Sequence, residues 1–179
     1  MARAPSGHAA LATAERWLVS TNRWVLIVGL AAMATLVFAN VVSRYLLNYS
    51  FSWVEELTRY MMIWLCLLGS GLALRYGAHI AVDVLQDLLP RAAARALRAL
   101  ILAVLAITLV VLIWLSFDYA EFGWYQETPV MNLSFGMVYL AIPIGCVLML
   151  LHLLFIAKGF VLDRQFDHDT SFRAEDAAL

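Results

Sequence analysis

The sequence predicts an all-α integral membrane protein with four transmembrane helices, an interfacial amphipathic helix between the second and third, and both termini in the cytoplasm. The first supporting observation is composition: 64% of the 179 residues are hydrophobic, only 14% are charged, and the mean hydropathy is +0.82. Soluble domains are typically about half apolar and about a quarter charged. The second observation is a set of four long apolar stretches. The third is the uneven distribution of arginine and lysine among the segments around them.

The four apolar stretches are each close to the length of about 20 residues that a helix needs to cross a hydrocarbon core. They cover residues 24–43, 57–74, 99–117 and 133–157, and they predict a single four-span membrane domain over residues 1–162. Residues 163–179 contain few large apolar side chains, which predicts a disordered polar tail. A cleaved signal peptide ending near Ala39 is the alternative for the first stretch. However, that stretch is longer than a signal core of roughly 7–15 residues.

The positive charges predict how the four spans are oriented. Because cytoplasmic segments carry the excess of lysine and arginine, both ends and the middle connection are expected in the cytoplasm. The connections on the other side contain only Arg44 and Arg59, while the three expected cytoplasmic segments contain Arg3, Arg16, Arg23, Arg75, Arg91, Arg95, Arg98, Lys158, Arg164 and Arg173. The net charge of -1 gives no reason to expect nucleic acid as a partner.

Two glutamates and an arginine stand where the second span begins. Ser52 and Glu55 have the spacing of a capping box, in which each side chain accepts from the other residue's amide. Glu56 would add negative charge to the first helical turn, and Arg59 is placed to pair with Glu55. A contact surface for another protein is the second interpretation, and capping does not exclude it. That surface would consist of Trp53, Glu55, Glu56 and Arg59.

Small residues recur every four positions along three of the spans. Gly69, Ala73 and Gly77 form such a stripe on the second span, which allows close approach of another helix backbone. Shorter sets on the first and fourth spans are Ala31, Thr35 and Ala39, and Ala141 with Gly145. The stripes fit packing within the protein, and docking to the helices of a partner would use the same physics.

The connection between the second and third spans has the pattern of a helix that lies in the membrane interface. From His79 to Leu89, apolar residues follow helical spacing and acidic residues occupy other faces. Pro90 suits the first position of the next helix. Residues expected to meet lipid headgroups or the interface are Arg44, Arg75, His79, Arg91, Arg95 and Arg98. Ordinary anchoring of the spans explains these arginines as well as specific lipid binding does.

The middles of the spans contain no Asp, Glu, Lys or Arg, although a path for a polar solute normally needs polar groups at membrane depth. Thr35, Asn40, Ser70, Thr108 and Ser116 are scattered and are expected to bond to their own helix or to a neighbour. Pro143 predicts an interruption in the fourth span. The sequence therefore offers no catalytic, substrate or metal site and no visible solute path.

A haem-binding redox anchor is one alternative for a four-span protein. Such a protein needs histidines on facing helices, and only His152 lies within a span, near its inner end, where an interfacial residue is expected. Cys66 and Cys146 lie in apolar runs and are interpreted as small buried hydrophobic residues.

Several motifs together resemble a family of transporter subunits. The stretch Phe51-Ser-Trp-Val-Glu-Glu-Leu is followed by Arg59-Tyr60, Trp64, Gly69 and Arg75-x-Gly77-Ala-His79-Ile-x-Val-Asp83, and Asn40-Val-Val-Ser-Arg44-Tyr45 precedes it. This combination resembles the small membrane subunit of tripartite ATP-independent periplasmic (TRAP) transporters, the DctQ-type permease. The resemblance covers roughly Asn40 to Asp83 by motif and nearly the whole chain by its four-span layout.

The resemblance implies a function in the bacterial inner membrane without catalysis or a cofactor in this chain. It implies a large permease subunit as partner, which carries the solute and sodium sites, and a periplasmic binding protein that delivers an organic acid-type solute. The small subunit would brace the large one, contribute to the periplasmic docking surface and contact phospholipids. A stand-alone membrane assembly protein is the remaining alternative.

Overall fold

The computed structural model describes residues 7–75 and 89–163, and within them the secondary structure is helical apart from one isolated β-bridge. The helices are α1 (Gly7–Leu46), α2 (Ser52–Arg75), α4 (Arg91–Gly123), α5 (Phe135–Tyr139) and α6 (Ala141–Asp163). Four segments are long and apolar enough to cross a membrane, as the sequence predicts: Thr13–Leu46, Ser52–Arg75, Ala92–Gly123 and Phe135–Ala157. Nearly all of the predicted interfacial helix from His79 onward, Gly77 of the predicted packing stripe, and the tail from residue 164 lie outside the described residues.

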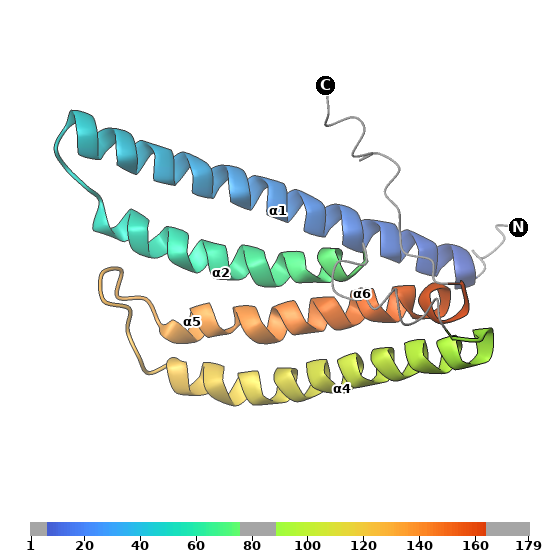
Figure 1. Cartoon of the computed structure of the whole chain (residues 1–179). Coiled ribbons are helices and arrows are strands. Elements are labelled where there is room, and N and C mark those ends of the chain that lie inside the picture. The colour runs from blue at the N-terminus through green and yellow to red at the C-terminus, as the bar shows by residue number, and fades with distance from the viewer. Residues whose placement is uncertain (1–6, 76–88, 164–179) are drawn as a thin grey trace, which may run out of the picture.

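The long helices pack side by side in the order α1, α2, α6, α4, so that they form a row (Figure 1). The contact between neighbours is substantial at each step of this row, within the part of the chain that the structure describes. Only 6% of the apolar window of α1 is buried, compared with 39% for the fourth span, because α1 is at an edge and α6 is central. The buried apolar cluster therefore follows α6 and consists of Leu74, Leu102, Leu109, Cys146, Leu153, Ile156 and Phe160.

Connections 47–51 and 124–134 lie at one end of the row, here named the paired-loop end. The start of α1 and the end of α6 lie at the other end, here named the terminal end (Figure 1). Asn48 has a φ of 51°, which asparagine tolerates better than most residues, and this turn lets the amide of Leu47 donate to the carbonyl of Ser43 at 2.8 Å. The turn ends α1 and directs the chain back into α2.

The fourth span is interrupted, as Pro143 predicts. It is divided into α5 and α6 at Leu140, three residues before the proline, which has no N–H to continue the helix ladder. At the N-terminus of α4, Pro90 directly precedes the helix, whereas the sequence predicts it in the first helical position.

The contact between α2 and α6 uses Gly145, as the sequence predicts, and Gly71, which the predicted stripe on the second span does not contain. A Cβ on Gly145 of α6 would lie 2.7 Å from Leu67 Cβ and 3.0 Å from the Leu67 carbonyl oxygen on α2. A Cβ on Gly71 would meet the His152 ring at 2.7 Å. Gly69 instead faces Leu26 of α1 at an ordinary 3.7 Å. The predicted stripe therefore faces α1 at Gly69, and the contact between α2 and α6 uses a different face of α2.

The predicted set on α1 does not pack on another described helix, since Ala31, Thr35 and Ala39 are exposed. Gly29 instead lies against Leu65 of α2. On α6, by contrast, Ala141 is fully buried and Gly145 is at the seam, so that the expected packing role is confirmed there. Cys146 is buried as expected, whereas Cys66 is exposed on α2.

The scattered polar residues of the spans behave as the sequence predicts. Thr35, Ser70, Thr108 and Ser116 each donate to a carbonyl three or four residues earlier in their own helix. Asn40 bonds to the next element instead, because its Oδ1 accepts from the amide of Phe51 at 2.8 Å. These bonds satisfy the hydroxyl and amide groups locally, as lipid surroundings require.

Candidate functional site

At the paired-loop end, Glu55 joins the end of α1 to the start of α2. Its Oε1 accepts from the Arg44 guanidinium and, at 3.1 Å, from the Ser50 hydroxyl, and Arg44 also donates to Ser50. The structure thus differs from the predicted capping box, since Glu55 pairs with residues before α2 and not with Ser52 or Arg59. Arg44, expected among the lipid headgroups, is half exposed and pairs with Glu55. Both residues stabilise the α1–α2 turn.

Glu56 is turned inward, although it is adjacent to the exposed Glu55. Its residue exposure is 4%, its Oε1 accepts from the Tyr60 hydroxyl at 3.0 Å, and its Oε2 accepts from the amide of Val130 at 2.8 Å. Val130 belongs to the connection between α4 and α5, 74 residues further along the chain. Glu56 therefore holds the connection between α4 and α5 onto α2, a long-range role that the sequence did not reveal.

The connection held by Glu56 is itself ordered by hydrogen bonds. An isolated β-bridge pairs Glu127 with Ser134, and the amide of Thr128 donates to the Leu133 carbonyl at 2.8 Å. The Thr128 hydroxyl, which is almost fully buried, accepts from the Leu133 amide at 3.0 Å. The Ser134 hydroxyl accepts from the Gly136 amide and thereby caps α5. Segment 124–134 is therefore a compact structured loop.

Of the four residues expected on a contact surface, Trp53, Glu55 and Arg59 are exposed and Glu56 is buried. Trp53 lies edge-on to Phe51, with ring centroids 6.2 Å apart. Further large side chains on this end are exposed, namely Tyr45, Leu46, Leu47, Tyr49, Trp124, Tyr125 and Val130. The available surface is thus broader and more aromatic than the sequence motif alone suggests.

At the terminal end, Arg75 joins α2 to α1. Its guanidinium forms an ion pair with Glu15, and its side chain is only 8% exposed. About two helical turns further along α1, Asn22 is also buried and donates through Nδ2 to the carbonyl of Leu68 at 3.0 Å. Arg75 was expected at the lipid headgroups, but its pairing with Glu15 makes it part of the α1–α2 contact.

Arg98 is buried as well, with 9% of its surface exposed. Its Nε donates to the Ala94 carbonyl at 3.2 Å, and its Nη1 donates to the Phe160 carbonyl in the last turns of α6 at 3.1 Å. This position differs from the expected one at the lipid headgroups, because the carbonyl groups near a helix C-terminus attract a cation. Arg95, one helical turn away, is exposed, and the side chain of Arg91 lies outside the described residues.

We expect Arg98→Met to destabilise the contact between α4 and α6. Methionine keeps most of the aliphatic packing but removes both hydrogen bonds from the guanidinium, each worth about 1.5–3 kcal/mol when charged. A thermal unfolding scan of the full-length chain in mild detergent measures the change. Arg95→Met is the matched control and should leave the unfolding temperature nearly unchanged; an equal loss in both variants would contradict the role of Arg98.

The sequence predicts an interfacial residue at His152. In the structure its side chain is instead fully buried between α6 and α2. It faces Gly71, and neither ring nitrogen has a hydrogen-bond partner among the described residues. The imidazole fills the space that the missing Gly71 side chain leaves. Within residues 7–75 and 89–163, no three His, Cys, Asp or Glu side chains lie together in a way that would hold a metal ion.

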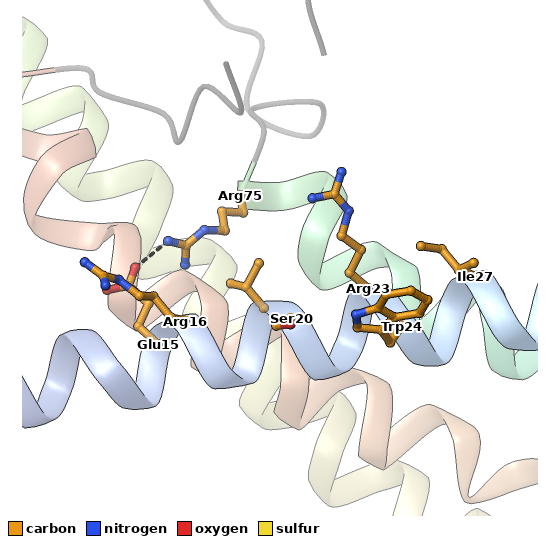
Figure 2. Close-up of a pocket in the computed structure, with 8 residues that line it drawn as sticks. Glu15, Arg16, Ser20, Arg23, Trp24, Ile27 and Arg75 are labelled. Carbon is orange, nitrogen blue, oxygen red and sulfur yellow. Dashed lines mark hydrogen bonds and ion pairs between the residues drawn. The ribbon is translucent and has the colours of Figure 1, made fainter. Parts of the chain in front are cut away.

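A groove of about 720 Å³ lies beside α1 at the terminal end. Figure 2 shows Arg75 reaching from α2 to Glu15, with Arg16 beside Glu15 and with Arg23 and Trp24 further along α1. The groove is lined by Glu15, Arg16, Val19, Ser20, Arg23, Trp24, Ile27 and Arg75. Apart from the general excess of arginine at this end, no sequence pattern predicts this groove.

Four long apolar helices in a row, with polar clusters at both ends, define the chain as a multi-pass membrane protein. The family model for the DctQ component of tripartite ATP-independent periplasmic transporters matches residues 33–158. The chain therefore belongs to the family of TRAP transporter small permease subunits, and the predicted resemblance is confirmed.

Curated relatives agree with this family. The ectoine TRAP transporter small permease protein TeaB of Halomonas elongata is 27% identical over 90% of this chain and 84% of its own length. The C4-dicarboxylate TRAP transporter small permease protein DctQ of Vibrio cholerae is 34% identical over 56% of this chain and 46% of its own length. The isethionate TRAP transporter permease protein DctMQ of Oleidesulfovibrio alaskensis is 27% identical over 72% of this chain but only 22% of its own length. These relatives are transporter subunits and not enzymes.

Proposed function

We propose that this chain braces the large permease subunit of a TRAP transporter in the inner membrane and does not conduct the solute itself. The observation that carries this proposal is the row of helices. The single row formed by residues 7–75 and 89–163 encloses no interior through which a polar solute could pass. The hydroxyl groups of Thr35, Thr108 and Ser116 in its spans are occupied by local hydrogen bonds. Translocation at membrane depth would need accessible polar groups.

The wide apolar faces of the row support a bracing role. Exposed side chains on α1 and α4 include Val28, Leu30, Phe38, Ile107 and Trp114. Contiguous exposed apolar surfaces of this kind mark contacts with lipid or with another protein. The DctMQ relative, in which the matched region is about a fifth of a longer permease, supports close association of a small-subunit region with a larger one. One face of the row would pack on the large subunit and the other would meet lipid.

In this proposal the two ends of the row lie on opposite sides of the membrane and differ in function. The paired-loop end faces the periplasm, since the positive-inside rule favours the arginine-rich terminal end in the cytoplasm. Its exposed Trp53, Glu55 and Arg59 contribute to the docking surface for a periplasmic binding protein. Sodium and the solute bind in the large subunit. Organic acids are the proposed solute class, although the relatives are named for solutes as different as ectoine and isethionate.

Co-purification tests the proposed partnership. The full-length chain, tagged in its native membrane and extracted in mild detergent, should recover a larger many-span protein in equimolar amount. A tagged four-span protein of unrelated family from the same membrane is the control and should not recover it. Recovery of this chain alone, or solute flux through liposomes that contain only this chain, would contradict the proposal.

A further inference from the structure

We infer that the groove beside α1 at the terminal end binds the headgroup of one anionic phospholipid. Among the residues that the structure describes, the groove is lined by three guanidinium groups, those of Arg16, Arg23 and Arg75, and by one carboxylate, that of Glu15. Glu15 is already paired with Arg75, so that the lining has an excess of positive charge. Guanidinium groups bind phosphate oxygens in pairs of parallel hydrogen bonds, which makes a phosphate group the matching ligand chemistry.

The apolar part of the lining indicates a lipid and not a soluble phosphate. Trp24 and Ile27 form one side of the groove and are 63% and 48% exposed. Both belong to the segment Thr13–Leu46, which is apolar enough to cross a membrane, and Val28 and Leu30 continue its exposed surface. A charged hollow therefore meets an apolar helix surface, as a headgroup with its acyl chain requires.

The position of the groove fits a ligand in the membrane interface. Trp17 and Trp24 are both exposed on the same part of α1, and tryptophan is enriched where headgroups and acyl chains meet. Figure 2 shows that the groove residues come from two helices, with the Glu15–Arg75 ion pair between them. A bound headgroup would thus contact both α1 and α2 and stabilise their junction at the edge of the row. This inference requires a membrane protein but does not depend on the transporter proposal.

Native mass spectrometry of the full-length chain, recovered in mild detergent with its co-purifying proteins, tests the inference. The chain is titrated with phosphatidylglycerol and, separately, with zwitterionic phosphatidylcholine. Wild type should retain one phosphatidylglycerol in preference to phosphatidylcholine. Arg16→Gln and Arg23→Gln should each weaken this binding about fivefold, from roughly 1 kcal/mol per arginine at a membrane surface. Arg23→Lys, which keeps the charge, should recover part of the affinity.

Arg95→Gln is the matched control, because Arg95 is an exposed arginine of α4 that does not line the groove. It should bind phosphatidylglycerol as wild type does. Equal binding by all variants would overturn the inference, as would displacement of the lipid by millimolar inorganic phosphate, which would identify a site for the free ion. Loss of a co-purified protein from the Arg16 and Arg23 variants with lipid binding unchanged would also overturn it and identify a protein contact.

Discussion

Glu56→Ala is expected to release the connection between α4 and α5 from α2 and to lower the unfolding temperature of the chain by roughly 5 °C. The carboxylate accepts from the Val130 amide and from the Tyr60 hydroxyl, and alanine removes both acceptors from a position that is 4% exposed. Hydrogen exchange gives a more specific readout, since the Val130 amide should exchange faster. Thermal unfolding and exchange are both measured on the full-length chain in mild detergent.

Two comparisons separate this role from a general effect of charge at the start of α2. Tyr60→Phe removes one donor to Glu56 and should leave the Val130 amide protected. Glu55→Ala removes the neighbouring carboxylate, whose ion pair with Arg44 is about half exposed, and exposed pairs contribute only ~0–1 kcal/mol. Equal exchange of the Val130 amide in the Glu55 and Glu56 variants would show that Glu56 does not hold the loop.

The difference between Glu55 and Glu56 also gives the docking proposal a clear test. Glu55 is exposed beside Trp53 and Arg59, so Glu55→Lys alters the proposed docking surface with little effect on the buried network. Sequence patterns alone cannot make this distinction, because two adjacent glutamates in one helical turn look alike until their partners are known. Val130 is 74 residues away from Glu56, and no local pattern connects them.

Helix existence and number could be predicted from the sequence because lipid imposes a length and a composition on each span. The hydrogen bonds from the hydroxyls of Thr35, Ser70 and Thr108 to carbonyls of their own helices could be predicted from the same requirement. The order of the helices in the row could not be predicted, since a helix that is apolar on all sides gives no sign of which face is buried. For that reason the stripe through Gly69 predicted a packing surface but not the helix that packs against it, which for Gly69 is α1.

The burial of two arginines also could not be predicted from the sequence. Arg75 and Arg98 belong to the arginine-rich region between the second and third spans, whose positive charge predicts an anchoring role. Nothing in their spacing distinguishes them from the exposed Arg95. Their actual partners are Glu15 of α1 and the Phe160 carbonyl of α6, both distant in the sequence. Charge placement therefore predicted the end of the molecule at which these residues lie, but not whether they face lipid or another helix.

Gly145→Ala is expected to destabilise the chain strongly, because it forces apart the two helices at the centre of the row. The new Cβ would lie 2.7 Å from Leu67 Cβ, 3.0 Å from its carbonyl oxygen and 3.1 Å from its carbonyl carbon. Backbone atoms cannot rotate away as the end of a side chain can, so α2 or α6 must shift. Overpacking of this kind costs about 1–3 kcal/mol, and the backbone clash places Gly145 at the upper end.

Gly69→Ala is the matched control, since it makes the same chemical change on the neighbouring seam. Its Cβ would lie 3.7 Å from Leu26 of α1, an ordinary contact, and alanine favours a helix over glycine by about 1 kcal/mol. We therefore expect Gly69→Ala to unfold at the wild-type temperature or above it, and Gly145→Ala well below it, in detergent scans of the full-length chain. A greater loss for Gly69→Ala than for Gly145→Ala would restore the stripe predicted from the sequence and contradict the α2–α6 seam described by the structure.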